Sequence, residues 1–209
     1  MTKKTAQART GYHHGNLVEA LVAAAIAIIE EKGVDNLSVR EVAKRAGVSV
    51  GAPFRHFESK TALLTAVAEQ AIERLTLAVT AELSNTDDSD PVQALHAIGR
   101  AYLSWVLENP THFQVVSSRS LINFSGSPKL VEQNENIRLL MIDLIARGQQ
   151  DGHLSHKVKP EDLLFCLRAM GYGIARMWAD GHFEEWKVDG PPQQAMLSAL
   201  DVFISSIRS

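Results

Sequence analysis

Apolar residues recur at intervals of three and four along almost the whole chain of 209 residues, which is the spacing of one face of an α-helix. The segment after Asn16 shows the pattern, with Leu17, Leu21, Ala25 and Ile28 on one stripe. No stretch alternates apolar and polar residues between hairpin signals, as a half-buried β-strand does. The sequence therefore predicts an all-α fold.

Capping residues, prolines and glycines divide this pattern into about nine helices. Ser, Asn and Asp at a helix start accept hydrogen bonds from free backbone N–H groups, and proline is tolerated at the first helical position. Glycine just beyond the last turn ends a helix. These signals predict helices over residues 16–33, 38–47, 49–57, 59–83, 91–108, 110–120, 128–151, 160–180 and 191–207.

The polar segment SNTDDSD, residues 84–90, marks a linker between two parts. Residues 1–60, extended by the long helix to about residue 83, form an N-terminal three-helix head, and residues 84–209 form a larger C-terminal helical domain. Residues 1–60 contain nine Lys and Arg against six Asp and Glu, a net charge of +3, and the remainder contains twelve against eighteen, a net charge of −6. A basic head on an acidic body is expected when only the head meets phosphates.

The cellular setting is indicated by three features of the sequence. Cys166 is the single cysteine, so an internal disulfide is impossible. No apolar run reaches the roughly 18 residues that span a bilayer. The basic segment 1–16 is not followed by an apolar segment and cleavage site of secretory type. We therefore expect a cytoplasmic protein that does not interact with membranes.

Residues 38–57 contain two short helices joined by a tight turn at Gly47, which is the pattern of a helix-turn-helix. Ser38 is positioned to cap the first helix and Ser49 the second. The second helix of such a unit enters the major groove of DNA, and its N-terminal N–H groups face phosphates. The sequence therefore predicts binding to double-stranded DNA.

The second helix lies in the stretch VSVGAPFRHF, residues 48–57, and contains two residues that usually disfavour helices. In its first turn most N–H groups lack helical partners, so Pro53 is tolerated there. Gly51 has no Cβ and allows the backbone to approach DNA closely. Val50 and Ala52 can meet thymine methyl groups, and arginines such as Arg55 can contact guanine or phosphate.

The segment LSVREVAKRAGVSVGAPFRHFESKTALL, residues 37–64, resembles the DNA-binding head of the TetR family of transcriptional regulators. The segment YHHGNLVEALVAAAIAIIEEKG, residues 12–33, resembles the first helix of that family and the residues before it. The resemblance covers residues 12–72, about a third of the chain. It implies a repressor that binds a palindromic operator as a homodimer and is released by a small-molecule effector.

The resemblance also assigns residues to DNA contacts. Val50, Ala52 and Phe54 stand where the family often has lysine, threonine and tyrosine, so polar contacts are lost there and more weight falls on Arg40, on Arg55 and on DNA shape. An alternative reading places Phe54, with Leu37, Val42 and Phe57, in the core of the head and Arg45 on a solvated face. The implied DNA contacts are Ser38, Arg40, Ser49, Val50, Gly51, Ala52, Phe54, Arg55, His56 and Lys60, together with Arg9, His13 and His14 from the leader.

Apolar residues cover more of the helix at 160–180 than one core face requires, which suggests a dimer interface. A second seam at three- and four-residue spacing follows in the last helix. Two such helices from each chain can form a four-helix interface, whereas the alternative is a core within one chain. The predicted interface residues are Leu167, Ile174, Met177, Trp178, Met196, Leu200, Phe203 and Ile207.

The resemblance implies an effector pocket in the C-terminal domain, coupled to the spacing of the two heads. Ordinary core packing is the alternative for each candidate, and nothing in the sequence identifies the effector. The candidate pocket residues are Trp105, His112, Phe113, Phe124, Arg138, Met141, Phe165 and Met170.

An enzyme and a helical protein–protein adaptor are the competing functions. Cys166 lies within an apolar stretch, an unfavourable place for an activated thiolate. His153, His156 and the other six histidines form no zinc signature, and there is no glycine-rich phosphate loop. An adaptor has no need of a basic head. The sequence thus predicts a regulator without catalytic residues, metal or cofactor.

Overall fold

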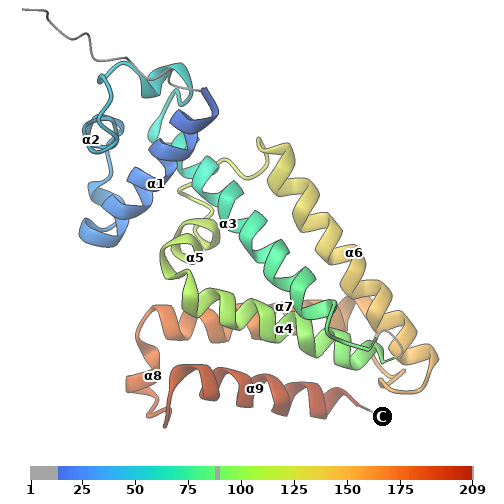
Figure 1. Ribbon diagram of the computed structural model, residues 1–209. Helices are drawn as coiled ribbons and strands as arrows, with labels where there is room; N and C mark the ends of the chain where they lie inside the picture. The colour runs from blue at the N-terminus through green and yellow to red at the C-terminus, as the bar shows by residue number, and fades with distance from the viewer. Residues whose placement is uncertain (1–13, 88–89, 209) are drawn as a thin grey trace, which may run out of the picture.

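The computed structural model describes residues 14–87 and 90–208 and confirms an all-α fold (Figure 1). In this part of the chain, β pairing is limited to an isolated bridge between Leu154 and Arg208. The two 3₁₀ helices are η1 (Val34–Asn36) and η2 (Pro53–Arg55). The α-helices are α1 (His14–Lys32), α2 (Val39–Arg45), α3 (Lys60–Leu83), α4 (Pro91–Glu108), α5 (Pro110–Ser117), α6 (Pro128–Gln150), α7 (Pro160–Ala179), α8 (His182–Glu185) and α9 (Pro192–Ile207).

Side-chain caps fix the starts of several helices, as the sequence predicts. The Oγ of Ser38 accepts a hydrogen bond from the N–H of Glu41 at 3.2 Å, and the Oγ of Ser59 accepts one from Ala62 at 3.1 Å. Asp90 accepts two, from the N–H groups at the second and third positions of α4, at 2.9 and 3.2 Å. Each bond satisfies a donor that the helix itself leaves free.

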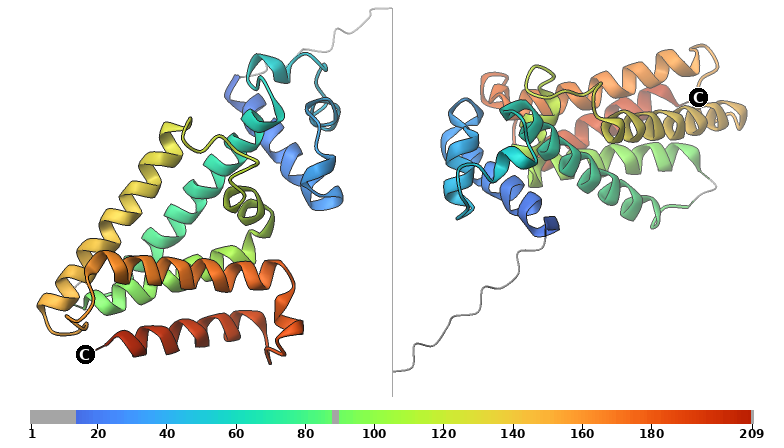
Figure 2. Two further views of the ribbon diagram at one scale, coloured as in Figure 1. Left: turned by 180° about the vertical axis from the view of Figure 1, so that it is seen from behind. Right: turned by 90° about the horizontal axis from the view of Figure 1, so that it is seen from above.

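The head consists of α1, α2, η2 and the first turns of α3, and it surrounds its own hydrophobic core. Leu21 and Ile28 of α1, Val42 of α2 and Leu63 of α3 are completely buried in it. Val115 of α5 also belongs to this cluster, so the head rests on the remainder of the chain. Figures 1 and 2 show the head at one end of the molecule and α7 and α9 at the other, with α3 running from the head into the body.

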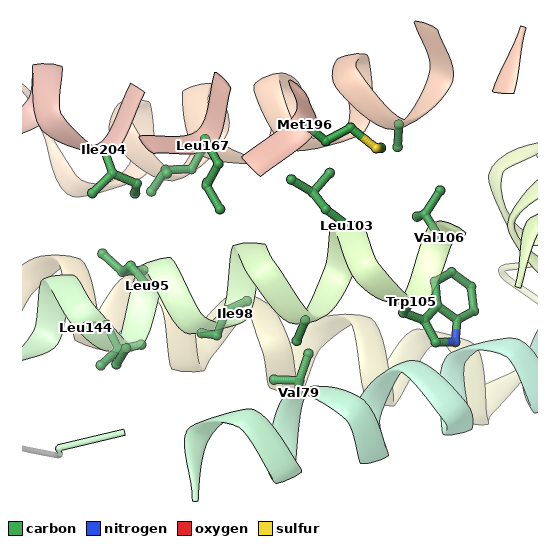
Figure 3. Close-up of a cluster of buried hydrophobic side chains, with 14 of the residues drawn as sticks. Val79, Leu95, Ile98, Leu103, Trp105, Val106, Leu144, Leu167, Met196 and Ile204 are labelled. Carbon is green, nitrogen blue, oxygen red and sulfur yellow. The ribbon is translucent and has the colours of Figure 1, made fainter. Parts of the chain in front are cut away.

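The body is organised around α4, which packs against α3, α5, α6, α7 and α9. Figure 3 shows Met196 and Ile204 of α9 and Leu167 of α7 directed towards Leu95 and Leu103 of α4. All five side chains are at most 6% exposed. The last helix therefore completes a core within one chain.

This packing corrects the predicted dimer seam. Leu167, Met196 and Leu200 are 6%, 0% and 2% exposed, so they cannot form a seam with a second chain. A repeat of three and four residues shows which side chains share a face, but not whether that face meets its own chain or a partner. The remaining candidates are partly buried and keep some surface: Ile174, Met177, Trp178, Phe203 and Ile207.

Some predicted helix boundaries were wrong. α1 begins at His14 rather than Asn16, and α5 ends at Ser117 rather than near Ser120. The four-residue helix α8 follows Gly181, whose φ of 81° ends α7, and it is too short to show an apolar stripe. None of the described helices is both long and apolar enough to cross a bilayer.

Candidate DNA-binding surface and ligand cavity

The second helix of the helix-turn-helix is largely 3₁₀ rather than α. The N–H groups of Ala52, Arg55 and His56 donate to carbonyls three residues back, at 2.9, 3.3 and 2.9 Å. Pro53 has no N–H and cannot close an α turn onto the carbonyl of Ser49. The cap position of η2 is accordingly Ala52 and not Ser49, which corrects the predicted α-helix and its cap.

The turn before η2 and η2 itself expose most of their side chains. Val50 is 53% and Phe54 50% exposed, whereas Pro53 is buried and Phe57 is only 6% exposed. The reading of Phe54 as a core residue was therefore wrong: Pro53 and Phe57 anchor the segment and Phe54 faces outward. A Cβ on Gly51 would meet no atom of the described residues within 4 Å, so no contact with them requires glycine there.

Some Lys and Arg side chains of the head form ion pairs with carboxylates, and others do not. Arg45 forms a two-pronged pair with Glu31, at 2.6 and 2.5 Å, and Lys32 pairs with Glu41. The hydrogen bond from Arg45 lowers the pKa of Glu31. Among the described residues, Arg40 forms no ion pair. The other cations in the described part of the head without one are Lys44, Arg55 and Lys60.

The remaining predicted DNA contacts have varied surroundings. Ser38 and His56 are exposed, and Ala52 is partly buried. Lys60 donates from Nζ to the carbonyl of Asp35 at 3.1 Å, which ties the start of α3 to η1. In the leader, Arg9 and His13 lie outside the described residues, and His14 is placed only as the first residue of α1.

A cavity of about 220 Å³ lies between α3, α4, α6 and α7, and Leu200 of α9 also lines it. Most of its wall is apolar. Two of the predicted pocket residues, Met141 and Met170, line it. Its polar groups fall into two sets. Tyr102, Arg168 and Tyr172 lie on α4 and α7, and the set on α3 and α6 is Thr76, Thr80, Gln133, Asn134 and Asn136.

Among the other predicted pocket residues, the aromatic ones lie away from the cavity wall. Trp105 is 3% exposed in the core of the body. Phe113 is buried behind the wall, with its ring 6.5 Å from that of Tyr102 and 6.4 Å from that of Tyr172. Phe165 is 73% exposed on the outer side of α7. Helical periodicity does not distinguish a cavity wall from a core or from an outer surface, so only the structure shows which of the predicted pocket residues line the cavity.

The remaining candidates also lie elsewhere. Arg138 pairs with Glu135 on the surface of α6, at 2.6 Å. The ring of Phe124 lies 3.5 Å beneath the guanidinium of Arg119. Arg168 lines the cavity but is not among the predicted pocket residues, although a single arginine within the apolar run 163–170 is a visible signal.

His112, a further pocket candidate, joins α5 to α3 instead. It is 5% exposed and its Nε2 lies 3.1 Å from Oε1 of Gln70. Burial, with a smaller contribution from the nearby charge of Arg74, lowers the pKa of His112 to about 4. The imidazole is therefore neutral in the folded protein at neutral pH.

This histidine should make the stability depend on pH. Its pKa rises from about 4 in the folded protein to ~6.5 in the unfolded chain. The unfolded chain thus binds the extra proton in this interval, so the free energy of unfolding should fall by up to about 3 kcal/mol as the pH drops from ~6.5 to ~4. Urea denaturation of the wild type and of His112→Gln across this range measures the effect. His156→Gln, which alters an exposed histidine that forms no ion pair among the described residues, is the control. An equal slope in wild type and His112→Gln would contradict the assignment.

Nowhere in residues 14–87 and 90–208 do three His, Cys, Asp or Glu side chains gather where they could hold a metal ion. Cys166 is exposed on α7 rather than enclosed by the apolar stretch around it.

Two family models match the chain. Residues 21–67 match the model described as bacterial regulatory proteins of the tetR family, and residues 95–203 match the tetracyclin repressor-like C-terminal domain. The first match contains the helix-turn-helix and the second contains most of α4 to α9.

Individual proteins agree with these matches. The HTH-type transcriptional regulator CymR of Pseudomonas putida is 38% identical over 76% of this chain and 78% of its own length. The regulator YvdT of Bacillus subtilis is 41% identical, over 26% of this chain and only 28% of its own length. A solved structure from Rhodococcus sp. RHA1 has a TM-score of 0.77 and 27% identity, covering 96% of this chain and 100% of that one.

Proposed function

Because this chain belongs to the TetR family, whose members are DNA-binding transcriptional regulators and not enzymes, we propose that it is a repressor. In this proposal it binds a palindromic operator as a homodimer in the cytoplasm, and a small-molecule effector releases it. Residues 1–60, extended to about residue 83, bind DNA, and residues 84–209 bind the effector and the second chain. No cofactor, metal or membrane takes part.

The exposed surface of the helix-turn-helix is the observation that carries the DNA-binding proposal. Arg40 of α2 and Arg55 of η2 are exposed cations without an ion pair among the described residues. Val50 and Phe54 are apolar and exposed in the same segment. Arginine can bond guanine in the major groove, and apolar groups can contact thymine methyls. The surface supports recognition by few polar groups and by DNA shape.

An exposed apolar face of α7 and α9 supports the homodimer. Phe165 of α7 is 73% exposed and Val202 of α9 is 72% exposed. Ala169 is exposed one turn after Phe165, and Ala199 three residues before Val202. A Cβ on Gly173 would meet no atom within 4 Å, so a second helix can approach closely there. Exposed apolar patches of this kind mark protein interfaces, and this face replaces the buried seam residues in the proposal.

Helix α3 supports coupling between effector and DNA because it belongs to both sites. Leu63 and Val67 are completely buried in the core of the head, whereas Thr76 and Thr80 of the same helix line the cavity. A ligand that favours one position of α3 therefore also favours one position of the head. Release follows if that position does not fit the operator spacing.

Selection of bound fragments from the source genome tests the proposed function, followed by gel-shift titration of the enriched sequence. We expect a palindrome, and an affinity that falls roughly 10²- to 10³-fold between about 50 and 200 mM salt if about four to six phosphates are neutralised by the two heads. A random duplex of equal length is the control. The absence of an enriched sequence, or binding that does not change with salt, would refute the proposal.

A further inference from the structure

The cavity has an unbalanced charge. Its lining includes no Asp or Glu among the described residues, and Arg168 is its one cation. Arg168 is exposed at the edge of the cavity and forms no ion pair within the described part of the chain, whereas Arg138, Arg147 and Arg176 each pair with a carboxylate three or four residues away. An unpaired guanidinium at the edge of an apolar space favours an anionic occupant.

A second arginine increases the local excess of positive charge. Arg119, in the segment after α5, lies against the ring of Phe124. Its pKa is lowered by partial burial and then by the like charge of Arg168. Two guanidinium groups that repel each other are stabilised by an anion placed near both.

Two phenol groups complete a set of donors beside Arg168. Tyr172 lies one turn after Arg168 on α7, and Tyr102 faces both from α4. Burial raises the pKa of Tyr102 to about 12, with the charge of Arg168 acting weakly in the opposite direction. Its hydroxyl therefore remains a proton donor at neutral pH. Neither phenol hydroxyl has a hydrogen-bond partner among the described residues.

The two threonine hydroxyls on the opposite wall already form hydrogen bonds within the chain. The Oγ of Thr76 lies 2.9 Å from the carbonyl of Ile72 and 3.2 Å from Oε1 of Gln133. The hydroxyl of Thr80 donates to the carbonyl of Thr76 at 2.8 Å. The neutral amides of Gln133, Asn134 and Asn136 on α6 can also donate, but Arg168 is the one charged donor among the described lining residues, and the remaining wall is mainly leucine, isoleucine and methionine. A cavity of ~150 Å³ accommodates benzene, so about 220 Å³ accommodates a molecule of one ring or a short chain.

We propose that the effector is a compact hydrophobic monocarboxylate, whose carboxylate binds Arg168 and the hydroxyls of Tyr102 and Tyr172 while its hydrocarbon part fills the cavity. This inference rests on the proposed function, because it specifies the ligand of the same effector site. Arg168 is the residue that determines specificity for the anion, and Arg119 adds positive potential.

Calorimetric titration of the full chain with three probes tests the inference: 3-phenylpropanoate, octanoate and cyclohexanecarboxylate. Each is compared with its neutral primary amide, which has nearly the same shape. The variants are Arg168→Met, which removes the charge, Arg168→Lys, which retains it, and the control Arg138→Met, which removes a paired cation outside the cavity. Circular dichroism checks that each variant is folded.

We expect at least one carboxylate to bind the wild type about 10- to 100-fold more tightly than its amide, because the amide lacks the negative charge that hydrogen-bonds to Arg168. Arg168→Met should abolish this preference, Arg168→Lys should restore part of it, and Arg138→Met should retain it. Equal binding of acid and amide, a preference that survives in Arg168→Met, or no binding of any carboxylate at millimolar concentration would overturn the inference. Operator binding by the unliganded wild type is measured separately, so failure of the proposed function remains distinguishable.

Discussion

Val202→Glu and Phe165→Glu, made separately, should each convert the protein to a monomer and weaken operator binding by about 10²-fold or more. Both side chains are more than 70% exposed on the apolar face of α7 and α9. A two-fold interface contains every substitution twice, so each variant introduces two carboxylates into an apolar contact. A single head then binds at nearly the level of non-specific contacts, ~10⁻⁴ to 10⁻⁶ M, instead of ~10⁻⁸ M or tighter.

Sedimentation gives the oligomeric state and gel shifts give the affinity of these variants. The thiol of Cys166, on the same helix face and the single cysteine of the chain, should react slowly in the wild type and rapidly in the monomers. Leu77→Glu is the matched control, because Leu77 is 67% exposed on α3, away from this face. Met196→Glu should unfold the protein instead, since Met196 is completely buried. A dimer that persists in Val202→Glu and Phe165→Glu would show that the face is not the interface.

Replacing both Arg40 and Arg55 by alanine should lower operator affinity by at least about 100-fold and relax sequence preference. A bidentate contact between arginine and guanine contributes ~1–3 kcal/mol of discrimination, and the dimer would lose two arginines from each head. The segment has few other polar side chains to compensate, since Val50 and Phe54 are its exposed neighbours. Competition between operator and random duplex at constant salt measures the change.

Two further variants distinguish contacts with DNA bases from contacts with phosphates and from the effect of net charge. Lys60→Ala should weaken binding to all sequences by a similar factor, as a phosphate contact does. It also removes the bond to Asp35 that ties α3 to η1, so thermal unfolding is followed in parallel. Lys157→Ala, which removes an exposed lysine between α6 and α7, is the control for net charge. If the arginine variant lowers operator and random binding equally, both arginines contact only the backbone of the DNA.

Local signals explain why so much of the fold could be predicted. The start of α3 depends on one hydrogen bond that Ser59 accepts from an N–H three residues later, and the start of α4 depends on Asp90 and Pro91. Both interactions lie within one turn and are visible in the sequence. The same holds for the end of α1, where Gly33 has a φ of 79°. Even the deviation in η2 has a local cause, because Pro53 lacks the N–H that an α turn needs.

The sequence by itself thus determined the helical class, most helix ends, and the basic segment expected to meet DNA, because these depend on neighbours within a few residues. Only the tertiary structure decided which apolar residues face inward. Met196 meets α4 and Val202 faces outward, although both are apolar residues of one helix. It also decided that Arg168, and not Trp105 or Phe113, borders the cavity. These outcomes depend on the angles at which distant helices pack, and no spacing within one helix encodes them.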